Sequence, residues 1–137
     1  MPKPKPILHW SNRQRRYRLR LAFFRQKVER ALERLPPERI DRLPPSLEFV
    51  FVGASESSRL HLRFSGDPAP ADVLAFHHGE IIVCPNVAAH NHRLHRLTLQ
   101  NEILTYLLHG LLHLAGYRDT TRKGASTMRR LQTRLRK

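Results

Sequence analysis

ILTYLLHGLLHLAGYRD, residues 103–119, is the stretch that decides the fold of this 137-residue chain. Its leucine and isoleucine side chains, at positions 103, 104, 107, 108, 111, 112 and 114, point to nearly every side of a helix. A helix that is apolar all round is buried within its domain. We therefore predict a central buried helix from about His95 to Ala115. Gly116 ends this helix, because glycine readily takes the left-handed conformation found at helix C-termini.

Two histidines interrupt the apolar helix, and an aspartate follows it. His109 and His113 are four residues apart, so they project from one face with Cβ atoms about 6 Å apart. After the turn at Gly116, Asp119 adds a carboxylate to the two imidazoles. Three protein ligands with a fourth position left to water is the pattern of a catalytic zinc site. Histidines at this spacing are also found as ordinary residues that hydrogen bonds satisfy, and the residues alone leave both interpretations open.

The residue after the first histidine bears on the class of reaction. Zinc peptidases of the His-Glu-x-x-His type place their general base there, whereas this chain has Gly110. Peptidase chemistry by that route therefore lacks its base. Hydrolysis of a phosphodiester needs less from the protein, because a metal ion polarises the phosphate and acidifies water while a cation stabilises the developing charge.

The composition favours a polyanionic partner. The chain carries 25 Lys and Arg against 11 Asp and Glu, a net charge of +14, which suits nucleic acid or an anionic membrane face. No apolar run reaches the eighteen or so residues that cross a bilayer, and the start, Met1 to Pro6, lacks the apolar stretch of a signal peptide. The single cysteine, Cys84, allows no internal disulfide. These features together predict a cytoplasmic protein with no membrane partner.

The positive charge is concentrated near the two ends of the chain, mostly as arginine. Eight basic residues and one acid lie between Arg13 and Arg30, and the C-terminal tail is basic as well. Arginine grips phosphate with two parallel hydrogen bonds, although each block is also compatible with a solvated helix face. The residues predicted to bind nucleic acid are Arg13, Arg15, Arg16, Arg18, Arg20, Arg122, Lys123, Arg129 and Arg130.

Around the central helix we expect helices on a small sheet, the α+β class, in a single domain over residues 1–137. Apolar spacing predicts a basic N-terminal helix over about residues 13–35 and a basic C-terminal helix over about 121–137. Strands are expected near residues 7–10, 47–52, 73–76 and 80–84, and residues 55–64 form a short helix or a turn. Glu102 is assigned to the surface or to capping. His77, His78, His90, His92 and His95 match no compact ligand set and are expected in exposed loops.

Three segments resemble successive signatures of one family. They are ADVLAF (71–76), GEIIVCP (79–85) and HGLLHLAGY (109–117). In this order and spacing the chain resembles the YbeY endoribonuclease, or rRNA maturation factor, family over about residues 60–119. The resemblance implies an α+β domain with a small mixed sheet, a bound zinc ion and cleavage of single-stranded RNA. It also implies a role in rRNA maturation and ribosome quality control, in contact with ribosomal particles in a bacterial cytoplasm.

The sequence departs from the family pattern at several positions. The family's last motif ends Gly-Tyr-Asp-His, with that histidine as third metal ligand, and Asp119 stands in its place. Carboxylate oxygen also binds zinc. Ser65 stands where the family has its active-site arginine, and Arg63, two residues away, is the candidate to replace it. Ala71 and His77 replace a threonine and a proline.

The resulting hypothesis is a zinc-dependent endoribonuclease that acts on ribosomal RNA. One Zn²⁺ per chain is held by His109, His113 and Asp119, Arg63 is the catalytic cation, and no small-molecule cofactor is expected. The alternative, favoured by the substituted ligand and the displaced arginine, is a non-catalytic ribosome- or RNA-binding protein in which zinc only stabilises the fold.

Overall fold

The computed structural model describes residues 3–137. The predicted domain over residues 1–137 and the segment Met1 to Pro6 therefore lie outside it at their first two residues. A four-stranded sheet runs in the order β1-β2-β4-β3. The strands β1 (Ile7–Asn12), β2 (Ser46–Phe51) and β4 (Glu80–Val83) are parallel, and β3 (Val73–Ala75) is an antiparallel edge strand. The α+β class and the mixed sheet that the sequence predicted are therefore confirmed.

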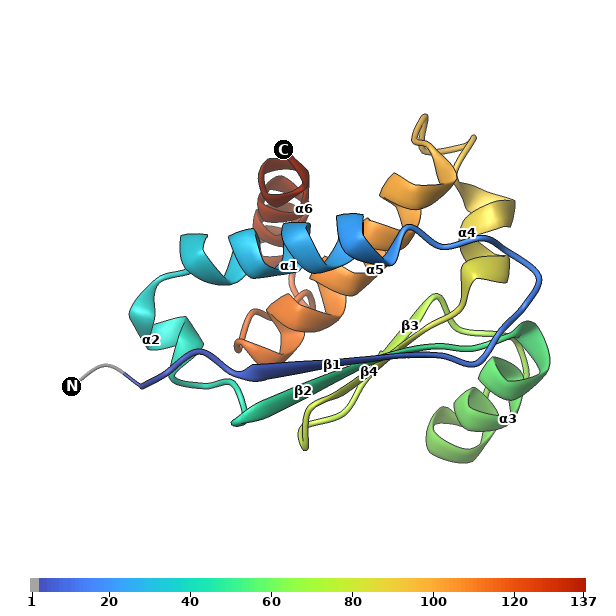
Figure 1. Ribbon diagram of the computed structural model, residues 1–137, viewed down its shortest axis with the longest axis horizontal. Helices are drawn as coiled ribbons and strands as arrows, with labels where there is room; N and C mark the ends of the chain where they lie inside the picture. Colours follow the sequence, from blue (N-terminus) through green and yellow to red (C-terminus); the bar gives the residue numbers. More distant parts are fainter. Residues whose placement is uncertain (1–2) are drawn as a thin grey trace.

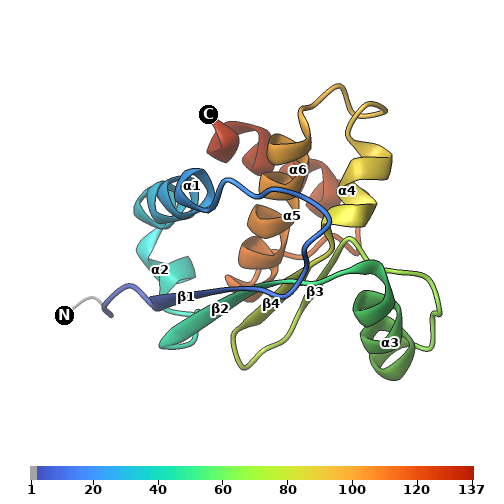
Figure 2. The ribbon, with the colours of Figure 1, turned by 45° about the vertical axis from the view of Figure 1, so that its right-hand side comes forward.

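Helices cover the two faces of the sheet unequally (Figures 1 and 2). One face carries α1 (Leu21–Arg34), α5 (Leu99–Leu114) and α6 (Arg122–Arg136), and the other carries α3 (Ala54–Ser65). Alternate β2 residues serve the two layers, because side chains in a strand alternate between faces. Phe49 and Phe51 join the large core under α1 and α5, whereas Val50 joins the small cluster against α3.

The central helix α5 is buried as predicted, although it begins at Leu99 and not near His95. It lies very close to the sheet. Thr98 caps it, its side chain accepting a hydrogen bond from Asn101 N at 3.1 Å. A Cβ at Gly110 would lie 2.7 Å from Ile81 and 3.2 Å from Val73. The glycine after the first histidine therefore allows the helix to approach the sheet, which explains why no side chain stands at that position.

The C-terminus of α5 turns the chain back across the histidine face. Gly116 has φ +92°, and its N–H donates to the carbonyl of His113 at 3.0 Å. The N–H of Tyr117 donates to the carbonyl of Leu112 at the same distance. These two bonds form a Schellman motif. The predicted stop at Gly116 is confirmed, and its geometry directs the following residues toward His109 and His113.

The N-terminal helix begins later than predicted. Instead of starting near residue 13, α1 starts at Leu21, and residues 13–20 form an irregular connection from β1. The buried Gln14 holds this connection, because its side chain accepts from Tyr17 N at 2.9 Å and donates to Tyr17 O at 2.9 Å. The arginines between positions 13 and 20 consequently lie on a connecting segment and not on a helix.

The structure contains two short helices that were not predicted, and it contains the predicted C-terminal helix. The short ones are α2 (Pro37–Ile40) and α4 (Pro85–Asn91). The helix α6 matches the prediction and is fastened to α1 at its C-terminus: Lys27 donates to Arg136 O at 2.7 Å, and Arg34 donates to Arg134 O at 3.1 Å. Within residues 3–137, every helix is too short or too polar to cross a membrane.

Candidate metal centre

The three predicted ligand side chains converge beside the C-terminal half of α5. The Nε2 atoms of His109 and His113 are 2.9 Å apart, and Asp119 Oδ2 lies 3.6 Å from each of them. One ligand atom from each residue lies within 4.8 Å of the other two. The helix supplies the imidazoles at i and i+4, and the turn at Gly116 supplies the carboxylate.

The spacing and chemistry of these atoms fit a divalent metal ion. Zinc binds imidazole nitrogen and carboxylate oxygen at about 2.0–2.2 Å, so its ligand atoms in a tetrahedral site are about 3.3 Å from one another. The observed separations of 2.9, 3.6 and 3.6 Å bracket that value. The three side chains are half-buried or exposed, so the group is accessible from solvent.

A buried glutamine supports the first imidazole. Gln132 on α6 is 8% exposed, and its side-chain amide lies 2.6 Å from His109 Nδ1. The amide atom placed against the ring is Nε2. A half-turn of the amide, which leaves its shape unchanged, puts Oε1 there, where it accepts the Nδ1 proton and leaves the His109 Nε2 lone pair facing the other ligands. Fixing the tautomer in this way is the usual task of a group that contacts a metal-binding histidine.

Sequence reasoning missed Gln132, although a signal was present. Met128, Leu131 and Leu135 form the apolar stripe of α6, and Gln132 lies on the same stripe, four residues after Met128. A polar side chain on a buried helix face needs a hydrogen-bond partner. The partner is a histidine 23 residues earlier in the chain, which no local pattern identifies.

The surroundings of His109 favour its neutral form. Burial lowers the pKa of the His109 imidazole, the neighbouring His113 lowers it further, and Asp119 acts in the opposite direction. A neutral imidazole is the form that binds a metal ion. The position is therefore prepared for metal binding before any ion arrives.

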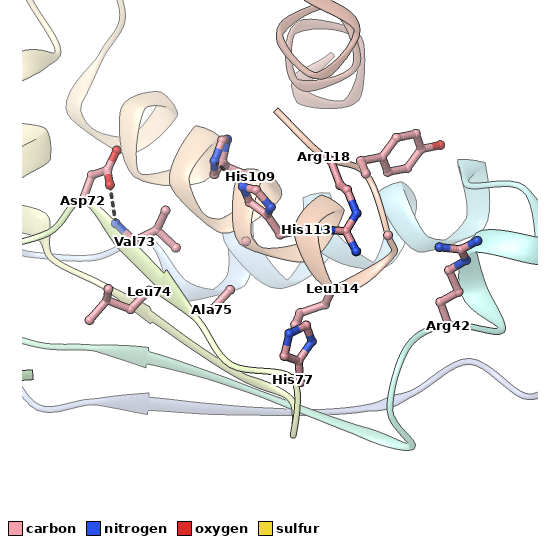
Figure 3. Close-up of a pocket in the computed structure, with 13 residues that line it drawn as sticks. Arg42, Asp72, Val73, Leu74, Ala75, His77, His109, His113, Leu114 and Arg118 are labelled. Atoms are coloured by element: carbon pink, nitrogen blue, oxygen red, sulfur yellow. Dashed lines mark hydrogen bonds between the residues drawn. The ribbon is translucent and has the colours of Figure 1, made fainter. Parts of the chain in front are cut away.

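A cavity of about 560 Å³ opens beside the histidines (Figure 3). Its floor includes β3, and Arg118, Arg42 and His77 line it together with His109 and His113. Arg118 follows the turn at Gly116, whereas Arg42 comes from the segment after α2. The cavity thus combines the two candidate histidine ligands with two guanidinium groups, an arrangement suited to an anionic substrate.

Arg63, the predicted catalytic cation, is not brought to this cavity. It lies exposed on α3, with its guanidinium carbon 5.6 Å from the ring centroid of Phe64. The helix α3 covers the opposite face of the sheet from α5 (Figure 1). Arg118 and Arg42 are the arginines that line the cavity. Ser65, which stands at the family's arginine position, is the last residue of α3.

The predicted nucleic-acid-binding residues all lie on the surface, but not all are free. Arg13 donates to Glu56 at 2.8 Å, and Arg20 lies over the ring of Phe23. Arg129 lies near the candidate ligands, since it lines a second cavity that also contacts His109. The remaining exposed members are Arg15, Arg16, Arg18, Arg122, Lys123 and Arg130.

Glu102 contradicts the surface or capping role expected for it. It is 1% exposed, and its carboxylate accepts from His95 Nδ1 at 2.8 Å. Burial, with a contribution from the Glu102 carboxylate, raises the pKa of the Tyr106 hydroxyl well above its usual value. The position of Glu102 on its own helix does not reveal this contact, because His95 comes from the loop before α5.

The fold and site define a small mixed-sheet α+β protein in which two histidines on the central helix meet one carboxylate from the segment that follows it. A family model described as endoribonuclease YbeY matches residues 9–137. The chain belongs to the YbeY family. The three matching motif segments, the mixed sheet and the histidine pair all agree with this assignment.

Individual relatives agree with the family model. The endoribonuclease YbeY of Thermotoga sp. (strain RQ2) is 39% identical over 74 residues, 50% of this chain and 49% of that protein. The Bdellovibrio bacteriovorus protein of the same name is 32% identical over 102 residues, covering 70% and 68%. A solution structure from Thermotoga maritima covers 95% of this chain and 87% of its own, with a TM-score of 0.55 and 25% identity. The chain spans about half the length of the Thermotoga sequence relatives that it matches.

Proposed function

We propose that this protein is a metal-dependent endoribonuclease that cleaves single-stranded RNA. The observation that carries the proposal is the convergence of His109, His113 and Asp119. The two histidines of this group also line a cavity, together with Arg42 and Arg118. The relatives that bear the name endoribonuclease support the reaction class. The net charge of +14 supports a polyanionic substrate.

The proposal assigns one Zn²⁺ per chain to His109, His113 and Asp119. Two imidazoles and one carboxylate form a ligand set used by catalytic zinc sites. When bound, the ion supplies Lewis-acid polarisation of a phosphodiester and lowers the pKa of water. We assign to Gln132, with its amide oxygen turned to Nδ1, the task of keeping His109 in the tautomer that offers Nε2.

The protein's own cations bind and orient the substrate. Arg118 and Arg42 are positioned to hold the non-bridging oxygens of a phosphodiester, because guanidinium groups bind phosphate with paired hydrogen bonds. Charge that develops on those oxygens during cleavage is stabilised by the same two groups. Arg63 stays a prediction for this role, and the experiment below includes it.

Ribosomal RNA and ribosomal particles are the proposed partners, and the cytoplasm is the proposed location. The family resemblance supports rRNA maturation and ribosome quality control as the cellular role. The exposed arginines at positions 15, 16 and 18 support contact with a large RNA surface. No small-molecule cofactor is part of the proposal.

Cleavage of single-stranded rRNA fragments tests the proposal. Wild type and His113→Ala are compared with and without a chelator, and Arg118→Ala is compared with Arg63→Ala. Of the four samples in the first comparison, we expect cleavage only by wild type without chelator. In the second comparison, we expect Arg118→Ala to lose more of the cleavage activity than Arg63→Ala. Equal cleavage by wild type and His113→Ala, irrespective of chelator, would reject the mechanism.

A second candidate function follows from the departures of this chain from its family. Asp119 replaces the family's third histidine ligand, and Ser65 stands at the arginine position, so a non-catalytic RNA-binding protein whose zinc only stabilises the fold is the alternative. Binding to ribosomal particles without cleavage under any divalent metal would support this function. Metal-dependent turnover would exclude it.

Elemental analysis separates the ligand question from the activity question. Purified wild type is compared with Asp119→Ala, and we expect one zinc per chain in the former and loss of zinc in the latter. Retention of a full zinc equivalent in the variant would remove Asp119 from the ligand set.

A further inference from the structure

A second cavity, of about 450 Å³, also borders His109. His109 and Asp72 line both cavities, so the two share a wall at the candidate metal centre. The helix α6 contributes much of the second cavity, and the loop before α5 contributes His95. A ligand that extends across His109 can therefore contact both cavities.

Cationic groups gather in this second cavity. Arg129 and Arg136 line it from α6. The hydroxyls of Thr105 and Thr133 also line it, but they donate to the carbonyls of Asn101 at 2.8 Å and Arg129 at 3.0 Å. Arg136 is fixed in place, because its guanidinium donates to Thr105 Oγ1 at 3.0 Å. Arg129 is exposed and free to meet a ligand at the rim.

A buried carboxylate orients a third basic group. Glu102 accepts from His95 Nδ1, at 2.8 and 3.0 Å to its two oxygens. The half-exposed His95 thereby presents its other nitrogen, Nε2, away from Glu102. Since Glu102 is 1% exposed, a ligand in the cavity has little contact with its carboxylate, which is hydrogen-bonded to His95. Asp72 is the exposed carboxylate at the shared wall, and the other charged side chains left to meet a ligand are Arg129, Arg136 and His95.

Donors of this kind suit a phosphate group. The two guanidinium groups offer charge-assisted hydrogen bonds to the oxygens of one anion, and His95 adds another from Nε2 when its ring carries both protons. The shared wall at His109 places such an anion next to the phosphodiester that the first cavity would hold. Consecutive phosphates of a single RNA strand have this relationship.

We propose that the second cavity is a phosphate subsite for the RNA strand under cleavage, and that it binds a phosphodiester adjacent to the scissile one through Arg129, Arg136 and His95. The proposal rests on the proposed function for the identity of the strand. It goes beyond that function by giving the strand a path across the protein, with β3 and the Gly116 turn at one cavity and α6 at the other.

A scan with neutral linkages tests the subsite by binding alone. A fluorescent 2′-O-methyl oligoribonucleotide, which resists cleavage, carries a single methylphosphonate that is moved one linkage at a time. Affinity is measured by fluorescence anisotropy for wild type, Arg129→Ala and Arg130→Ala. Arg130 is the matched control, because it is the adjacent exposed arginine of α6 and does not line the cavity.

In wild type we expect one methylphosphonate position, next to the most sensitive one, to weaken binding about tenfold. In Arg129→Ala that penalty disappears, because the guanidinium group that would bind this phosphate is already absent, so neutralising the phosphate costs nothing more. In Arg130→Ala all affinities fall together and the penalty remains. A penalty that survives Arg129→Ala, or that disappears equally in both variants, would overturn the subsite.

This outcome is separable from the outcome of the cleavage assay. If the penalty couples to Arg129 but no RNA is cleaved, the subsite stands and the proposed endoribonuclease activity fails. If RNA is cleaved and no linkage couples to Arg129, the activity stands and the subsite is wrong. Both Arg129 and Arg130 are exposed, so neither substitution removes buried packing.

Discussion

The side-chain amide of Gln132 lies 2.6 Å from Nδ1 of His109, joining the last helix of the chain to the central one. The imidazole therefore has a hydrogen bond on one nitrogen and the candidate metal position on the other. Since Gln132 is buried, water does not readily replace the amide when it is removed. Orientation of the first ligand thus depends on α6.

Replacing Gln132 by alanine is expected to weaken zinc binding about 10- to 100-fold while the fold is retained, since contacts of this kind change metal affinity by that factor. Competition with a chromophoric chelator measures the affinity, and circular dichroism checks the fold. The matched control is Gln26→Ala on the exposed surface of α1. Equal zinc affinities for the two variants would contradict the orienting role.

Adding one methyl group at Gly110 should destabilise the protein by about 1–3 kcal/mol, the usual cost of overpacking a core. The new Cβ would lie 2.7 Å from Ile81, and α5 would have to move from the sheet. Gly53→Ala is the control, because nothing lies within 4 Å of a Cβ there and its φ is −77°. Urea unfolding measures both, and similar losses at both positions would show that close packing at Gly110 is unimportant.

Acid should destabilise the metal-free protein through His109. Its pKa is lowered in the folded state, chiefly by burial, so the unfolded chain takes up a proton near pH 6.5 and the folded chain only at lower pH. This contribution to stability is therefore present above pH 6.5 and is lost as the pH falls toward the folded-state pKa. Urea unfolding between pH 7.5 and 5.5 is expected to show a shallower decline in His109→Asn than in wild type.

An NMR titration provides the direct check on the same group. The His109 ring signals should titrate with a midpoint below 6.5 in the metal-free protein. A midpoint at or above 6.5 would contradict the effect of burial.

Removing His95 should cost about 1–3 kcal/mol of stability, because the buried carboxylate of Glu102 loses a hydrogen-bond partner. The comparison is between His95→Ala and His90→Ala, the latter an exposed histidine of α4. Thermal or urea unfolding at neutral pH measures the difference. If the two variants are equally stable, the pair between His95 and Glu102 contributes nothing.

Features encoded by local pattern were predictable from the sequence. The all-round apolar character of α5 identified the central helix, and a glycine at position 116 marked its end. The four-residue spacing of His109 and His113 placed two imidazoles on one side of that helix. Each of these signals lies within a few residues and depends on helix geometry alone.

Features that depend on distant partners were not predictable in the same way. The helix α1 starts late because Gln14 closes a turn ahead of it. In addition, the side chain of Gln100, 80 residues after Arg20, accepts from Arg20 N. Glu102 and Gln132 are buried because other segments cover them, whereas helical spacing alone described them as surface residues or passed over them. The second cavity follows from the same tertiary contacts.

Lys27 and Arg34 of α1 bind the carbonyls at the C-terminus of α6, and they thereby hold the helix that carries Gln132. A version of the chain cut off before Gln132 would keep the whole HGLLH sequence and Asp119, yet its first imidazole would be free to rotate. Surveys that recognise such proteins by that short motif alone would count damaged copies as intact. The tail therefore needs to be inspected together with the motif.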